Sequence, residues 1–220
     1  MVKFFSHVVA VATCAGWLAT GAWAQTPAGN VQAGQSKAAM CIGCHGIAGY
    51  QSSFPEVHKV PKIAGQTAEY LQAALLAYQT GERKHPTMRG IAGSLSAQDM
   101  ADLSAFYAQL APATTVAEQA PAAPAKVQAL LARGGCVACH GANYNKPLAP
   151  SYPKVAGQHA DYLYVALKSY QVQDNAVVGR GNAVMGGVAK QFTLGELKAM
   201  ANYLGGLSGD LAVVPQSRWR

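Results

Sequence analysis

The pentapeptide CIGCH at residues 41–45 occurs a second time as CVACH at residues 136–140. Cys-x-x-Cys-His is the attachment signature of c-type haem. On a helix, residues three and four positions apart lie on one face, so Cys44 and His45 project on the same side as Cys41. Two thiols then bond to the two vinyl groups of one porphyrin while the imidazole reaches its iron. The sequence therefore predicts two haem c groups, attached through Cys41, Cys44, Cys136 and Cys139, with His45 and His140 as iron ligands.

Cysteine pairs with this spacing also occur in zinc sites and in thioredoxin-like redox proteins. A zinc site that used both pairs would leave unexplained why a histidine follows each of them. A thioredoxin-like site needs a βαβ context, and the sequence has no such alternation of strands and helices. Two complete copies of the motif therefore favour two haems over either alternative.

The first 24 residues have the organisation of a secretory signal peptide. Lys3 supplies a positive start, residues 8–19 form a short apolar run, and Ala22-Trp23-Ala24 is a small-x-small cleavage site. A membrane-spanning helix needs about 20 apolar residues, more than this run contains. We therefore expect cleavage after Ala24 and export to the periplasm. The alternatives are an uncleaved anchor and a lipoprotein that keeps Cys14.

The positive charge of the chain is unevenly distributed. The formal net charge is +7, yet residues 25–118 carry six basic and six acidic side chains, whereas residues 119–220 carry ten basic and four acidic ones. Such a distribution orients a molecule toward an acidic redox partner or an anionic membrane surface. Nucleic acid is not expected as a partner, because the basic residues are scattered and the protein is predicted to be exported.

An internal repeat follows the two motifs. The segment PKIAGQ at residues 61–66 returns as PKVAGQ at residues 153–158, and each copy is followed by matching apolar positions with helical spacing. A second helix begins behind a capping-box sequence in each copy, at Ser96 and at Thr193. Strand signals are absent. Each repeat is therefore predicted to be a small helical domain, and the predicted fold class of the chain is all-α.

The repeat sets the expected domain boundaries. We predict a signal peptide over residues 1–24, a first domain over 25–110, and a second domain over 126–220. Residues 111–125 are rich in Ala and Pro, as in linkers that are semi-extended and fairly stiff.

The methionines are the candidates for the sixth ligand of each iron, which decides between electron transfer and chemistry. Met88 and Met185 occupy matching positions in the repeat, in what the sequence suggests is a loop before the last helix. Met100 and Met200 match leucines and are expected in the core. The predicted sixth ligands are therefore Met88 and Met185.

The remaining histidines are rivals for the same role. His85 is three residues from Met88, but its counterpart is Asn182, so the repeat argues against it. His58 and His159 have no matching partner and are expected at the surface or in supporting roles. Pro61 and Pro153 follow the motifs, and a proline-held carbonyl suits the ring N–H that a metal-bound histidine usually donates. A plain rigid turn is the alternative there.

Taken together, these motifs resemble the dihaem class I cytochromes c of the c4 type, over essentially the whole chain after residue 24. The resemblance implies two tandem cytochrome c domains, each around one covalently bound haem, with the haem propionates facing each other across the domain interface. It also implies an electron carrier of the periplasm that works between respiratory redox proteins at the membrane, toward a terminal oxidase. Two loops depart from strict repetition, one three residues shorter and one five residues longer in the second copy.

These features are compatible with three hypotheses for the function of the protein. The leading hypothesis is a free electron carrier that is not an enzyme and binds no small-molecule substrate, because both axial positions of each iron are filled. The second is the electron-accepting cytochrome subunit of a periplasmic dehydrogenase complex. The third, a dihaem peroxidase, requires an iron with an open or labile position, against which Met88 and Met185 both count.

Overall fold

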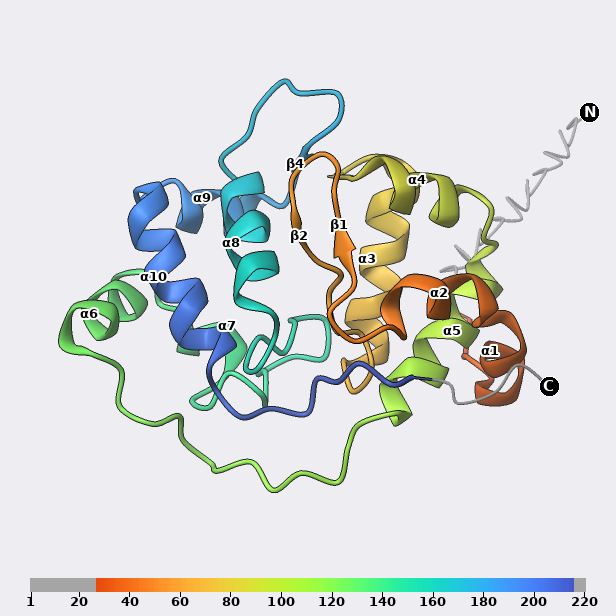
Figure 1. Cartoon of the computed structure of the whole chain (residues 1–220), viewed down its shortest axis with the longest axis horizontal. Helices are drawn as coiled ribbons and strands as arrows, with labels where there is room; N and C mark the ends of the chain where they lie inside the picture. Colours follow the sequence, from red (N-terminus) through yellow and green to blue (C-terminus); the bar gives the residue numbers. More distant parts are fainter. Residues whose placement is uncertain (1–26, 216–220) are drawn as a thin grey trace, which may run out of the picture.

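A computed structural model describes residues 27–215, and in it the two halves of the chain form two groups of helices that lie side by side (Figure 1). The predicted signal peptide, including Cys14, lies outside the described residues. The predicted all-α class is confirmed. The helices are α1 (Val31–Lys37), α2 (Ala39–His45), α3 (Ala68–Thr80), α4 (Pro86–Gly93), α5 (Ala97–Gln109), α6 (Ala125–Arg133), α7 (Val137–His140), α8 (Ala160–Ser169), α9 (Ala183–Ala189) and α10 (Leu194–Gly205).

Short strands are present in the described part of the chain, although the sequence carries no strand signal. β1 (Gln51–Ser52) and β2 (His58–Lys59) form an antiparallel hairpin. β3 (Arg83–Lys84) pairs antiparallel with β4 (Gly179–Arg180), so a strand of the first repeat pairs with a strand of the second. Each strand has two residues, too few for an alternating pattern to be recognised in the sequence.

In the first repeat, α1 crosses α5 at close range. A Cβ atom at Gly34 would lie 2.1 Å from the Asp102 carbonyl oxygen, so only glycine permits this approach. The Asp102 carboxylate accepts hydrogen bonds from the Asn30 backbone N–H at 2.8 Å and from Lys37 Nζ at 2.6 Å. Both ends of α1 are thereby held against the middle of α5.

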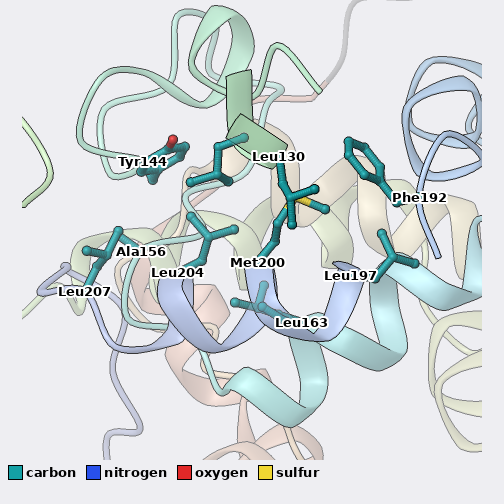
Figure 2. Packing of buried hydrophobic residues seen from close by; sticks show 11 residues of the cluster. Leu130, Tyr144, Ala156, Leu163, Phe192, Leu197, Met200, Leu204 and Leu207 are labelled. Atoms are coloured by element: carbon teal, nitrogen blue, oxygen red, sulfur yellow. The ribbon is translucent and has the colours of Figure 1, made fainter. Parts of the chain in front are cut away.

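Each repeat has its own hydrophobic core. Met100 in α5 and Met200 in α10 are 2% and 3% exposed, which confirms that both are core residues. Figure 2 shows the second core, where Met200 lies among Leu130 of α6, Leu163 of α8 and Leu197 of its own helix. The predicted capping boxes at the starts of α5 and α10 are also confirmed.

Two glutamines join the repeats with reciprocal hydrogen bonds. The Gln66 side chain accepts from the Lys154 backbone N–H at 2.9 Å and donates to the Lys154 carbonyl at 3.0 Å. The Gln158 side chain makes the same two bonds to the backbone of Lys62, both at 2.9 Å. These glutamines end the matching hexapeptides, so the repeats meet through equivalent residues, as across a local twofold axis.

Two connecting segments follow the outside of the molecule. Residues 111–124 have no regular structure and contact the second repeat, where the Pro121 carbonyl accepts from the Tyr203 hydroxyl at 2.6 Å. After α10 the chain returns to the first repeat, where the Ala212 N–H donates to the Ala64 carbonyl at 3.0 Å. Within residues 27–215, none of the helices combines the length and apolar character needed to cross a membrane.

Candidate functional site

A cavity of about 1020 Å³ extends between the helices of both repeats. This volume is at the upper end of the roughly 300–1,000 Å³ typical of a pocket for one small molecule. All eight predicted site residues line it, and they are Cys41, Cys44, His45, Met88, Cys136, Cys139, His140 and Met185. Residues almost 150 positions apart in the sequence are thus brought to one continuous space.

The two cysteine motifs lie at helical turns that end beside the cavity. α2 ends at His45 and α7 at His140, so each histidine is in the same turn as its cysteines. All four thiols are free. No group of three or more His, Cys, Asp or Glu side chains in the described residues is placed to hold a metal ion.

Each histidine is oriented by the proline carbonyl that the sequence indicated. His45 Nδ1 lies 2.8 Å from the Pro61 oxygen, and His140 Nδ1 lies 2.8 Å from the Pro153 oxygen. A carbonyl only accepts, so Nδ1 carries the proton and Nε2 keeps its lone pair. Burial lowers the pKa of both imidazoles, which favours the neutral form that binds a metal.

The two methionines lie on short helices, not in loops as the sequence suggested. Met88 is the third residue of α4 and Met185 the third residue of α9, and both are half-buried. His85 and Asn182 cap these helices, because their side chains accept from the backbone N–H of Met88 at 3.4 Å and of Met185 at 2.9 Å. The sequence missed these helices because glycines interrupt their apolar pattern.

The helix caps also explain the unmatched histidine. His85 and Asn182 do the same task, so a ligand role for His85 is not needed to account for its position. His58 was expected at the surface or in a supporting role, and its 5% exposure excludes the surface. The β1–β2 hairpin folds it inward, where its ring lies 5.9 Å from the Tyr162 ring. His159 is half-buried and precedes α8.

A pair of arginines lies where the two repeats meet at the cavity. Arg83 and Arg180 face each other across β3 and β4, and both donate to the Tyr162 hydroxyl. Neither guanidinium has a carboxylate partner in the described part of the chain. Arg83 Nε is buried without a hydrogen-bond partner. Burial raises the pKa of Tyr162, but the two arginines together outweigh burial, so this pKa is lowered overall.

The sequence pattern did not identify this arginine pair, nor the two interface glutamines, as functional. All four residues occupy matching positions in the repeat, and that pairing was the available signal. A buried cation such as Arg83 without a carboxylate calls for an anionic group nearby, because an unpaired buried charge is costly. Free thiol pairs, oriented imidazoles and uncompensated guanidiniums beside one cavity are the features that haem c groups with propionates require.

Comparison with known proteins agrees with this geometry. The family model described as "Cytochrome c" matches residues 31–111 and 124–208. Cytochrome c4 of Azotobacter vinelandii is 32% identical over 200 residues, covering 82% of this chain and 90% of the relative. The thiosulfate dehydrogenase electron acceptor of Thiomonas intermedia (strain K12) is 30% identical over 208 residues, covering 90% and 89%. The crystal structure of reduced recombinant cytochrome c4 from Pseudomonas stutzeri matches with TM-score 0.60 and 30% identity, covering 82% of this chain and all of that one (100%).

The fold, the two motifs and these matches define a protein with two cytochrome c domains, and the chain belongs to the cytochrome c family. Within that family it is a dihaem class I cytochrome of the c4 type. It is an electron-transfer protein, as the sequence predicted.

Proposed function

We propose that this chain is a periplasmic electron carrier with two haem c groups, one in each repeat. Cys41 and Cys44 attach the first haem, whose iron is bound by His45 and Met88. The second haem is attached and bound by the corresponding residues, which are Cys136, Cys139, His140 and Met185. The physiological partners we propose are membrane-bound respiratory proteins, with electrons passing toward a terminal oxidase.

One observation carries this proposal: the same set of side chains occurs twice around a continuous cavity. In each set, the imidazole has its Nδ1 bonded to a proline carbonyl at 2.8 Å, which leaves Nε2 available for iron. Each methionine enters from a helix capped by the residue three positions before it. Random matching of residue types does not produce equivalent supporting contacts in both halves.

When bound, each haem supplies one-electron redox chemistry at its iron. The proline carbonyls hold the imidazoles in one orientation and one tautomer, so little of this chain has to rearrange when charge is gained or lost. The methionine thioethers fill the position that a substrate would need, and they favour the reduced metal. The side chains therefore support electron transfer and oppose catalysis at the iron.

The arginine pair supports a propionate site between the repeats. Arg83 is 9% exposed and Arg180 half-buried, and both direct guanidinium N–H groups at the Tyr162 hydroxyl. We propose that carboxylates from both haems neutralise these two cations. A shared cation pair would hold the two haem edges close to one interface.

The test is to purify the exported protein and count its haems by intact mass and by pyridine haemochrome absorbance. We expect two thioether-linked haems and a near-infrared ferric band from thioether-bound iron that accounts for both. A protein with fewer than two covalent haems, or without this band, would contradict the proposal.

The name of one relative supports a second candidate. The chain is 30% identical to a thiosulfate dehydrogenase electron acceptor over almost its full length. An acceptor subunit would have the same haem sites and differ only in its donor. Affinity purification from the native membrane and periplasm distinguishes the two: a stoichiometric dehydrogenase partner favours this candidate, and isolation as a single chain favours the free carrier.

A further inference from the structure

Two buried hydroxyl groups face the first half of the cavity. Ser104 and Tyr107 are 1% and 7% exposed, and both line the cavity. Neither hydroxyl has a hydrogen-bond partner in the described part of the chain. They are three positions apart on α5 and so lie on one face of it. A buried hydroxyl without a partner is destabilising, which calls for a missing acceptor.

The second repeat has no hydroxyls at these positions. Ala201 and Leu204 match Ser104 and Tyr107 in α10. A hydrogen bond supports the alignment, because the Tyr107 and Leu204 carbonyls accept from equivalent glycine N–H groups at 2.9 and 3.0 Å. Tyr144 packs in the core of the second repeat, and Cys136 packs against the same core, but Tyr144 does not line the cavity. The cavity wall formed by α5 in the first repeat is thus polar, whereas the matching wall formed by α10 in the second repeat is apolar.

The missing acceptor for Tyr107 is close to the first haem attachment site. Cys41 packs against the core cluster that contains Tyr107, and both line the cavity. Burial raises the pKa of the Cys41 thiol to about 11, and the Tyr107 hydroxyl opposes that rise, as a donor to the sulfur would. A thioether sulfur has no hydrogen, so toward Tyr107 it acts only as an acceptor.

We propose that the Tyr107 hydroxyl donates a hydrogen bond to the Cys41 sulfur once that sulfur is thioether-linked, and that this bond favours the ferrous state of the first haem. The inference rests on the proposed haem site. The iron gains one electron from an external reductant, and no bond to the protein forms or breaks in that step. Tyr107 would act on the iron only through the Cys41 sulfur, so it is a positioning residue.

The direction of the effect follows from the orientation of the hydroxyl. A donor O–H places its positive end toward the haem, and the ferric haem carries one positive charge more than the ferrous haem. The bond therefore stabilises the ferrous state relative to the ferric state. Only the difference in the strength of this bond between the two states shifts the ratio of ferrous to ferric haem. An ordinary hydrogen bond of about 1 kcal/mol therefore changes this ratio by at most about fivefold. For one electron, this upper limit corresponds to about 40 mV, because 59 mV is tenfold.

The test compares Tyr107→Phe with Tyr203→Phe in the dihaem protein by redox titration. Tyr203 is a matched control on α10: its hydroxyl bonds to the linker at Pro121 and it does not line the cavity. We expect Tyr107→Phe to lower the ratio of ferrous to ferric first haem by up to about fivefold at a fixed potential, and to leave the second haem unchanged. Tyr203→Phe should shift neither haem.

The two haems are assigned by repeating the titration in a Met88→Ala background, which moves the potential of the first haem. An unchanged first potential in Tyr107→Phe, or equal shifts of both haems, would overturn the inference while two covalent haems are still present. Fewer than two covalent haems in the wild-type protein would instead overturn the proposed function. Haem counts and unfolding free energies of both variants show that the comparison is made on folded protein.

Discussion

The two repeats differ more in the segments that cover the cavity beside each cysteine motif than in the residues that line it. In the first repeat, 16 positions separate His45 from Pro61, and the chain between them forms the β1–β2 hairpin. In the second repeat, 13 positions separate His140 from Pro153, and turns replace the hairpin. The histidine–proline bond is nevertheless 2.8 Å in both. The supporting bond has been kept while its surroundings diverged.

This comparison separates two kinds of structural requirement. Attachment and orientation need fixed distances, and the two copies satisfy them in the same way. The extent to which each haem site is covered depends on the length of its loop. The polarity of the cavity wall depends on single side chains on α5 and α10. Both differ between the copies. Two haems held in the same way are therefore expected to differ in potential and in exposure to partners.

The largest expected effect comes from removing one pair of attachment residues. Cys41→Ala/Cys44→Ala should leave one covalent haem, because the second motif lies on a separate helix, α7. Intact mass and haem absorbance measure this directly. The matched variant Cys136→Ala/Cys139→Ala should also keep one haem. Loss of both haems from either variant would show that the crevices are not independently anchored.

Removing one axial methionine should have the next largest effect. Met88→Ala and Met185→Ala should each abolish about half of the near-infrared thioether band and lower the potential of one haem, because thioether ligation favours ferrous iron. Met100→Leu is the control, since Met100 is buried in the core and does not line the cavity. A full band in either alanine variant would identify another sixth ligand.

Substitution of the interface glutamines tests whether the repeats are joined symmetrically. Gln66→Leu and Gln158→Leu each remove two bonds to backbone groups of the opposite repeat. We expect each to lower the free energy of unfolding by about 1–3 kcal/mol, because a buried N–H and C=O lose their partners. Urea unfolding measures this, with the exposed Gln128→Leu as control. Clearly unequal effects would argue against a local twofold axis.

The smallest expected effect is a pH dependence that comes from the contact between α1 and α5 in the first repeat. The Asn30 backbone N–H and then Lys37 lower the pKa of Asp102, whose matching residue is Ala199. The lowered pKa means that the carboxylate stabilises the fold above its unfolded value of about 3.9. This contribution is lost as pH falls through the lower folded pKa.

Urea unfolding at a series of pH values checks this prediction. The stability difference between wild type and Asp102→Asn should shrink as pH falls below about 4. Asp174→Asn, which removes a carboxylate at an exposed position, is the control variant. A difference that stays constant from neutral to acidic pH would exclude the linkage.

The sequence predicted the features that occur in both repeats and the residues that cap helices. The matched hexapeptides, the capping boxes at Ser96 and Thr193, and the proline carbonyls were all readable because they combine residue type with position. The buried location of His58 was not readable, since it depends on a hairpin held by two-residue strands. Tyr107 was equally hidden, because its significance lies in the contrast with an ordinary leucine in the other copy.

The family resemblance implied an interface between the two domains, but the residues that make its contacts could not be predicted from the sequence. Matching of Arg83 with Arg180 indicated equivalence, but not that equivalent residues would face each other. Symmetry produces this result: a segment near a twofold axis meets its own counterpart. A repeat pattern shows which residues of the two copies are equivalent. The direction of the twofold axis that relates the copies depends on how they pack against each other.

The return of the chain after α10 has a consequence for its response to proteases. The Ala212–Ala64 hydrogen bond and the packing of Val214 tie the last part of the polypeptide to the first repeat. A single cut within residues 111–124 would therefore leave two fragments that still interlock through the carboxyl-terminal segment. The nicked molecule should elute from a sizing column as one particle and separate only in denaturant.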